Sequence, residues 1–210
     1  MNQQSLSQNY SRVVNLLIFI FPIVIISMQV AGDIVLFVLA MMGIYIAISR
    51  RLSPFAIKEI EVFSYLTFGY FIAICLSVVF SGQVAELAHY IPRDFYFLFA
   101  PFIALSLYRA KININYLIAG TKVSLLVIGS IVIYFGGGRN TGVMNAGVFG
   151  NLAVLLFFIV LAFSQHESFK RKIFTLIPLL FGFIAIIGSG TRGAWLSFLL
   201  LLGVYLFFFY

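Results

Sequence analysis

Long runs of apolar residues dominate this sequence and exclude an ordinary water-facing surface. Hydrophobic residues fill 63% of the 210 positions and charged residues only 9%, whereas soluble domains have about a quarter of charged residues. No polar stretch is long enough to form a separate soluble domain. We therefore expect an integral membrane protein, with the lipid bilayer as its first partner.

A membrane span needs about 20 mainly apolar residues, and the chain contains eight candidates, of which the fourth is short. Because lipid satisfies no backbone N–H or C=O group, and because these runs do not alternate as barrel strands do, we expect helices. The predicted fold is an all-α polytopic transmembrane bundle, one domain over residues 1–210, with Pro22, Pro101 and Pro178 inside helices. The predicted spans are 13–31, 33–49, 62–80, 95–108, 115–135, 146–163, 172–188 and 194–210.

The first two predicted spans are separated only by Gly32 and Asp33, which predicts a tight hairpin. The single cysteine, Cys75, lies inside an apolar run and has no Cys/His cluster around it in the sequence. A small buried side chain is the expected role of Cys75, and neither a metal nor another cofactor is expected.

The lysines and arginines are distributed unevenly between the loops. If the N-terminus is cytoplasmic, ten of the 13 basic residues fall on or near the cytoplasmic side and three on the opposite side. The positive-inside rule therefore predicts a cytoplasmic N-terminus, and topology explains the net charge of +7 without nucleic acid as a partner. Topology does not explain the three outer arginines, Arg93, Arg139 and Arg192, and a shared function on the outer face would.

The first outer loop, residues 81–94, contains a glutamate and a histidine three residues apart, Glu86 and His89. On a short interfacial helix these side chains would be neighbours able to transfer a proton. A solvated connector with a local ion pair between Arg93 and Asp94 is the simpler interpretation, and we favour it.

The second outer loop has three consecutive glycines before Arg139. Backbone N–H groups in such a segment can surround an anion, although a flexible turn is the simpler interpretation. No Gly-Lys-Ser/Thr follows, which excludes a P-loop. Further on, Asn151 can hydrogen-bond a sugar hydroxyl or, as we prefer, a neighbouring helix.

The third outer loop, residues 188–195, places Arg192 between two apolar spans, where an arginine is unfavourable without a partner or a function. Its glycines match G-x-G-x-x-G, but a dinucleotide site needs a βαβ unit and a later acid, and neither is indicated. Instead, Gly190 and Gly193 allow close backbone approach. Ser189 or Thr191 can cap a helix that begins near residue 194.

Arg192 would then lie at a helix N-terminus, which favours an anion, and its guanidinium can bind a phosphate through paired hydrogen bonds. Trp195 suits the membrane interface or stacking on a sugar ring. A structural arginine that pairs with carbonyl groups or lipid headgroups is the alternative.

The segment Ser-Gly-Thr-Arg-Gly-Ala-Trp-Leu at 189–196, between two apolar spans, resembles a motif of the O-antigen ligase and O-antigen polymerase superfamily. The earlier Val-Phe-Gly-Asn-Leu-Ala-Val-Leu-Leu at 148–156 resembles the helix two spans upstream in that family. The loop that ends at Arg93 resembles its N-terminal region. The resemblance covers the whole chain, but only about the first half of the family's architecture.

This resemblance implies a multi-pass glycosyltransferase of the bacterial inner membrane whose active site faces the periplasm, without a metal or another cofactor. Its partners would be an undecaprenyl-diphosphate-linked glycan and a lipid A core acceptor, and polymerases and protein-glycosylating enzymes are related alternatives. The predicted diphosphate-binding residues are Arg192, which matches the family's arginine motif, with Arg93 and Arg139. The supporting residues are Gly190, Thr191, Gly193, Trp195 and Asn151.

The family's catalytic histidine lies in a large periplasmic loop that this sequence lacks, so the catalytic residue is unassigned and a truncated product or fragment is expected. A membrane transporter is the alternative from another functional class. Its ion coupling would need acids near the membrane midplane, and the span centres contain none.

Overall fold

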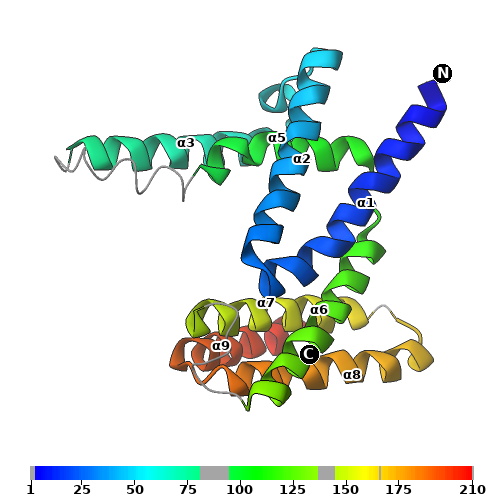
Figure 1. The fold of residues 1–210 in the computed structure, drawn as a ribbon, viewed down its shortest axis with the longest axis vertical. Helices are drawn as coiled ribbons and strands as arrows, with labels where there is room; N and C mark the ends of the chain where they lie inside the picture. The colour runs from blue at the N-terminus through cyan, green and yellow to red at the C-terminus, as the bar shows by residue number, and fades with distance from the viewer. Residues whose placement is uncertain (1–2, 81–94, 137–144, 166, 210) are drawn as a thin grey trace. The chain divides into compact units, whose positions relative to one another are not determined.

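The computed structural model describes residues 3–80, 95–136, 145–165 and 167–209, and the regular structure in these ranges is entirely helical (Figure 1). It comprises eight α-helices and the 3-10 turn η1 (Pro54–Ala56). The predicted all-α polytopic fold is therefore confirmed. The α-helices are α1 (Gln3–Ser27), α2 (Gln29–Arg50), α3 (Lys58–Phe80), α5 (Tyr96–Ala110), α6 (Ile114–Phe135), α7 (Ala146–Ser164), α8 (Phe169–Gly188) and α9 (Arg192–Phe209).

Each predicted span has its own helix in the structure, and most ends differ by only a few residues. Six helices are long and apolar enough to cross a membrane, judged by length and composition, whereas α5 and α9 are shorter apolar helices. As predicted, the three prolines lie within helices, namely α1, α5 and α8.

The boundary between the first two helices lies at Met28, earlier than the predicted break at Gly32 and Asp33. The N–H of Met28 bonds to the carbonyl of Val24 at 2.8 Å, and Met28 in turn accepts from Gly32 at 3.1 Å, so α2 has already begun. Gly32 instead permits a close approach, because a Cβ there would lie 3.0 Å from Cα of Ile25.

Side-chain and glycine caps define several of the other helix ends. Asn113 and Asn145 accept hydrogen bonds from the backbone N–H groups of Asn115 and Gly147 and so cap α6 and α7. Gly136, with φ of 79°, ends α6 in the left-handed conformation that glycine adopts without steric penalty. These local signals explain why the helix limits follow the sequence closely.

The described helices belong to two compact units. Unit 1 consists of residues up to Val14 together with Ile34–Ile112, and unit 2 consists of Asn15–Asp33 together with Asn113–Tyr210. The expectation of a single transmembrane domain over the whole chain stays a prediction.

In unit 1, α3 packs against α5, and both contact η1 (Figure 1). Helices α2 and α5 approach so closely at Gly43 that a Cβ there would lie 1.9 Å from the carbonyl oxygen of Phe102. Two hydroxyl groups near the start of α1 form hydrogen bonds to α5. The Tyr10 hydroxyl lies 2.8 Å from the Ser106 Oγ, and the Ser11 Oγ donates to the Ala110 carbonyl at 2.7 Å. Small residues and hydroxyl hydrogen bonds are typical of helix packing in membranes.

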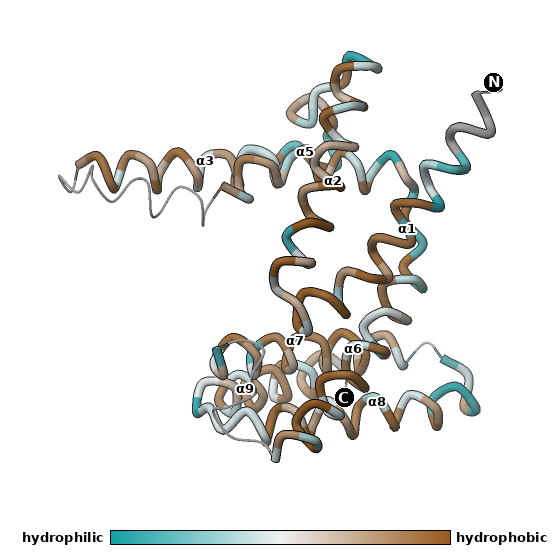
Figure 2. The backbone as a smooth tube through the Cα atoms, in the orientation of Figure 1, coloured by the Kyte–Doolittle hydropathy of each residue, from teal (hydrophilic) through white to brown (hydrophobic). Residues whose placement is uncertain are grey.

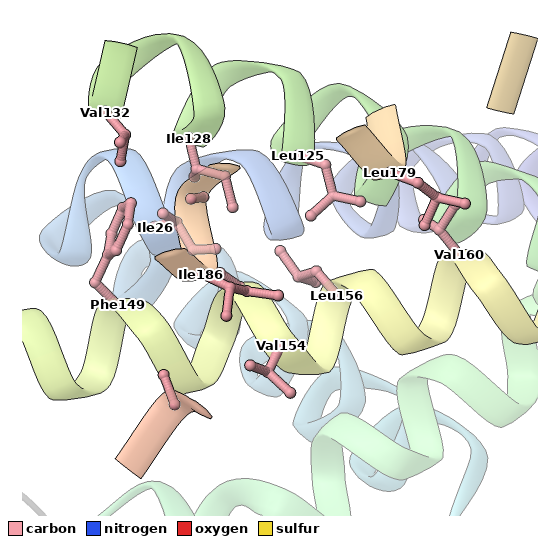
Figure 3. Packing of buried hydrophobic residues seen from close by; sticks show 13 residues of the cluster. Ile26, Leu125, Ile128, Val132, Phe149, Val154, Leu156, Val160, Leu179 and Ile186 are labelled. Carbon is pink, nitrogen blue, oxygen red and sulfur yellow. The ribbon is translucent and has the colours of Figure 1, made fainter. Parts of the chain in front are cut away.

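In unit 2, α8 packs against α6 and α7, and α7 also packs against α6 and α9. Phe149 of α7, Ile26 of α1, Val132 of α6 and Ile186 of α8 point toward one another in the core (Figure 3). Gly120 contributes a second close approach, since a Cβ there would lie 2.1 Å from the carbonyl oxygen of Phe19. The core of unit 2 therefore joins residues from both ends of the sequence.

Large apolar side chains cover much of the exposed surface of the helices. Figure 2 shows apolar residues along the length of the helices, with hydrophilic residues concentrated at places such as the start of α8. Soluble monomers rarely expose contiguous apolar patches above a few hundred Å². The chain is therefore a multi-pass membrane protein whose helices contact lipid.

Candidate anion-binding site at the start of α9

A tight turn of three residues joins α8 to α9. Its middle residue, Gly190, has φ of +63°, a conformation that costs a residue with a side chain about 1–2 kcal/mol. The N–H of Ser189 donates to the Ala185 carbonyl at 3.0 Å, and the N–H of Gly190 donates to the Ile187 carbonyl at 3.2 Å. These bonds satisfy two carbonyl groups at the C-terminal end of α8, and the positive φ favours glycine at position 190.

Buried hydroxyl groups hold this turn in place. Ser189 is fully buried, and its Oγ donates to the Ile186 carbonyl at 2.8 Å and accepts from the Thr191 N–H at 3.5 Å. The carbonyl of Thr191 accepts from the Trp195 N–H at 3.4 Å, which starts α9. Helix α9 thus begins at Arg192, two residues before the predicted start near 194, and Thr191 precedes it at the N-cap position.

The start of α7 packs directly against this turn at Gly150. A Cβ at Gly150 would lie 2.7 Å from both the Ala194 Cβ and the Ser189 Oγ, and 2.9 Å from the Thr191 Oγ1. Such separations are below van der Waals contact, so only glycine permits this packing. The small residues near position 150 were visible in the sequence, but their contact with the turn was not.

Asn151, the next residue of α7, is also connected to α9. Its Oδ1 accepts a hydrogen bond from the Ser197 Oγ at 3.3 Å. This contact confirms the preferred interpretation of Asn151 as a helix-packing residue, and its predicted part in substrate binding stays a prediction.

The predicted binding residues of the motif, Arg192 and Trp195, have exposed side chains. Trp195 is 40% exposed. A Cβ built on Gly193 would meet no atom of the described ranges within 4 Å, apart from its chain neighbours and the nearby backbone of α9. Nor does any carboxylate of those ranges form an ion pair with Arg192. The first N–H groups of a helix lack intrahelical acceptors and favour negative charge. An exposed guanidinium beside such groups is suited to binding phosphate.

The other predicted anion-binding arginines, Arg93 and Arg139, lie outside the described residues. The same holds for the possible proton-transfer pair, Glu86 and His89. Their convergence with Arg192 therefore stays a prediction.

A second polar cluster, which we did not predict, joins α6 to the α7–α8 loop and α8. The Lys122 Nζ lies 2.6 Å from the Glu167 Oε1 and donates to the Thr175 Oγ1 at 2.6 Å. Thr175 donates to the other Glu167 oxygen, also at 2.6 Å. Burial raises the pKa of Glu167, but the hydrogen bonds from Lys122 and Thr175 and the nearby positive charges outweigh it and lower the pKa.

Lys122 is one of the ten basic residues that the sequence places on or near the cytoplasmic side, where an orientation signal with a snorkelling side chain is expected. A lysine inside an apolar run is unfavourable without a partner, so the sequence did indicate a partner for Lys122, but only the structure shows that it is Glu167. Thr175 lies in the first half of α8, whereas Arg192 begins α9 beyond the other end of α8, so the cluster is separate from the candidate anion-binding site.

The described residues contain no group of three His, Cys, Asp or Glu side chains positioned to hold a metal ion. In the same ranges there is no β-strand, so the glycines of the 188–195 loop do not belong to a βαβ nucleotide site. Comparison of the chain with protein-family models, with curated proteins and with solved structures found no match.

Proposed function

We propose that this chain is a glycan-transferring enzyme of the O-antigen ligase type, located in the bacterial inner membrane with its active face in the periplasm. Its substrates would be an undecaprenyl-diphosphate-linked glycan and a lipid A core acceptor. One observation carries the proposal: Arg192 is an exposed arginine at the first position of an apolar helix. The resemblance of residues 189–196 to the superfamily motif supplies the reaction class.

The turn before α9 gives Arg192 a defined position. Ser189 is buried and hydrogen-bonded, and Gly150 packs against it, so the turn has little freedom to move. A rigid support matters because a guanidinium binds phosphate oxygens through two parallel hydrogen bonds of fixed geometry. The rigid turn therefore supports the interpretation of Arg192 as part of a preorganised binding site, in contrast to a freely moving surface arginine.

The same position suits the chemistry of glycan transfer. In the proposed reaction the acceptor hydroxyl attacks the anomeric carbon and gives its proton to a base, for which no residue is assigned. The bond to the lipid diphosphate breaks, and the diphosphate leaves with the electron pair. Arg192 and the N–H groups of the first turn of α9 would stabilise the negative charge that develops on it. The exposed Trp195 side chain, one turn further along α9, offers a flat surface on which a sugar ring can stack.

The direct test is binding of undecaprenyl diphosphate to the purified chain in detergent, with Arg192→Ala and Arg192→Lys. Charged hydrogen bonds contribute about 1.5–3 kcal/mol, so we expect Arg192→Ala to weaken binding about 10- to 100-fold. Arg192→Lys should be intermediate, because lysine keeps the charge and loses the paired geometry. Arg171→Ala is the matched control, since Arg171 is also exposed but lies at the other end of α8.

The reaction itself is tested in bacterial cells that carry the gene, by gel analysis of glycan-capped lipopolysaccharide. We expect Arg192→Ala to abolish capping at matched protein levels, whereas Arg171→Ala preserves it. Unchanged capping in Arg192→Ala cells would contradict the central role of Arg192. If Arg192→Ala loses diphosphate binding and leaves lipopolysaccharide capping unchanged, but glycan attached to another acceptor is lost, the polymerase or protein-glycosylating alternative is correct.

A further inference from the structure

Unit 1 contains a pocket that the proposed glycan transfer does not use. It has a volume of about 450 Å³ and lies between the start of α1, the end of α2 and the end of α5. Two arginines from different helices line it, Arg50 at the end of α2 and Arg109 in the last turn of α5. Tyr45 and Ser49 of α2, which both carry a hydroxyl group, also line the pocket. The pocket thus combines two positive charges with further hydrogen-bond donors.

Both arginines are exposed, and within the described ranges neither has an ion pair with a carboxylate. Each lies near a helix C-terminus, where the helix dipole favours a cation, and each also follows the positive-inside rule. Those two effects explain arginines at helix ends in general. They do not explain why the two side chains line one pocket, and a shared anionic ligand does.

Hydrogen bonds fix the walls of this pocket. Tyr10 lies 2.8 Å from the Ser106 Oγ and donates to the Ser106 carbonyl at 3.2 Å, so the start of α1 is held against α5. Ser11 adds the bond to the Ala110 carbonyl at 2.7 Å, next to Arg109. The pocket is therefore formed by packed helices and does not depend on a loop.

A second pocket, of about 390 Å³, extends this space along α2. The two share Tyr10, Met42 and Tyr45, and the second reaches Phe37, Val38 and Met41, which are all apolar. Positions 37, 38, 41, 42, 45 and 49 follow the spacing of one helix face. From 37 to 49 this face is about 18 Å long at 1.5 Å per residue, close to the roughly 15 Å depth of one leaflet of a 30 Å hydrocarbon core.

We propose that this groove binds one anionic phospholipid, with the phosphate between Arg50 and Arg109 and an acyl chain along the Phe37, Val38 and Met41 face of α2. A free phosphate would leave the apolar half unused, and a neutral lipid would leave the two arginines without a counter-charge. Basic pockets between transmembrane helices bind the headgroups of anionic lipids. By the positive-inside rule, the lipid belongs to the cytoplasmic leaflet, which places this site on the membrane side opposite to that proposed for Arg192.

The first experiment measures lipid binding to the whole purified chain by native mass spectrometry, with phosphatidylglycerol and with phosphatidylcholine. We expect phosphatidylglycerol to bind in one-to-one stoichiometry and the double variant Arg50→Gln, Arg109→Gln to bind it about 10- to 30-fold more weakly. The matched control is Arg12→Gln, Arg51→Gln, which removes two exposed arginines that do not line the pocket. Equal weakening in the control, or equal binding of the two lipids, would overturn the proposal.

Inorganic phosphate distinguishes a lipid site from a simple anion site. We expect phosphate at the concentration of the lipid to leave phosphatidylglycerol bound, because the acyl chain supplies much of the binding free energy. Displacement under these conditions would overturn the assignment to a lipid.

The second experiment uses the unchanged protein and so does not depend on the folding of a variant. Phosphatidylglycerol with a diazirine in its acyl chain is photolysed with the chain in bilayer nanodiscs, and the labelled residues are identified by peptide mass spectrometry. We expect labelling concentrated at Phe37, Val38 and Met41. Uniform labelling of all lipid-exposed helices, with no excess on this face of α2, would contradict a defined groove.

Discussion

Lys122 and Glu167, 45 residues apart in the sequence, form an ion pair of 2.6 Å. Thr175 completes a triangle with both side chains. Because the side chains retain only 22% and 18% exposure, water replaces these bonds poorly when one partner is removed. This pair therefore connects α6 to the loop before α8 more strongly than an exposed surface pair would.

Replacement of Glu167 by Gln should destabilise the protein by about 1–3 kcal/mol, since Lys122 loses a charged partner near the membrane. Thermal unfolding in detergent, followed by circular dichroism, measures the change. Adding Lys122→Met to Glu167→Gln should recover part of the loss, because the unpaired charge is then gone. Lys170→Gln is the control, since Lys170 is exposed and outside the cluster. Strictly additive effects of Glu167→Gln and Lys122→Met would show that the pair is not coupled.

The pair should also make stability depend on pH. The pKa of Glu167 is lowered from its usual 4.5, so the folded state favours the charged carboxylate. Its contribution is fully present above about pH 4.5 and is lost as the pH falls through the lower pKa of the folded state. We expect the difference in free energy of unfolding between the wild type and Glu167→Gln to be constant above about pH 5.5 and to shrink below about pH 4.5. A difference that grows on acidification would contradict this assignment.

Gly150→Ala should destabilise the contact between α7 and the turn before α9. Its Cβ would lie 2.7 Å from Ala194 and Ser189, and overpacking of this kind costs about 1–3 kcal/mol. In Gly193→Ala the new methyl group lies in open space, and alanine is a better helix former than glycine. The free energy of unfolding of Gly193→Ala should therefore be unchanged or higher. Thermal unfolding compares the two variants, and the fluorescence of Trp195, the only tryptophan, should shift in Gly150→Ala alone. Equal melting temperatures would show that the close approach does not matter.

Gly43→Ala tests the packing of unit 1 in the same way. A Cβ at Gly43 would lie 1.9 Å from a backbone oxygen, that of Phe102, which no side-chain rotation can move away. We expect a loss of at least about 2 kcal/mol, measured by thermal unfolding, and weaker phosphatidylglycerol binding because the α2–α5 contact opens. Gly69→Ala is the control, since nothing lies within 4 Å of its Cβ position. Equal melting temperatures for Gly43→Ala and Gly69→Ala would contradict the close packing of α2 against α5.

The predicted orientation is tested with single cysteines in a Cys75→Ala background. An impermeant thiol reagent added to intact cells should label a cysteine in place of Arg139, because position 139 is predicted to face the periplasm. A cysteine in place of Arg51 should be labelled only after the membrane is opened. Labelling of position 51 in intact cells would reverse the topology, and with it the sides assigned to Arg192 and to the lipid groove.

The sequence alone determined the properties that add up along the chain. Hydropathy over about 20 residues identified the helices, because a membrane span needs an apolar run of that length. The caps at Asn113, Asn145 and Gly136 were not predicted, although each of them acts within one helical turn. The position of Arg192 near a helix start followed from the same local reasoning. The boundary at Met28 was misplaced because packing against Ile25 gives Gly32 a role other than ending a helix. Helix α1 also begins at Gln3, ten residues before the predicted start of the first span.

Tertiary structure alone decided which side chains meet. Nothing local connects Lys122 to Glu167, Gly150 to Ser189, or Arg50 to Arg109, because each pair depends on which faces of distant helices are in contact. In a membrane most residues on every face are apolar, so hydropathy does not distinguish the packed face from the lipid-facing one. The distances between atoms of different helices do, and they show the buried support beneath Arg192 and the groove beside Arg50.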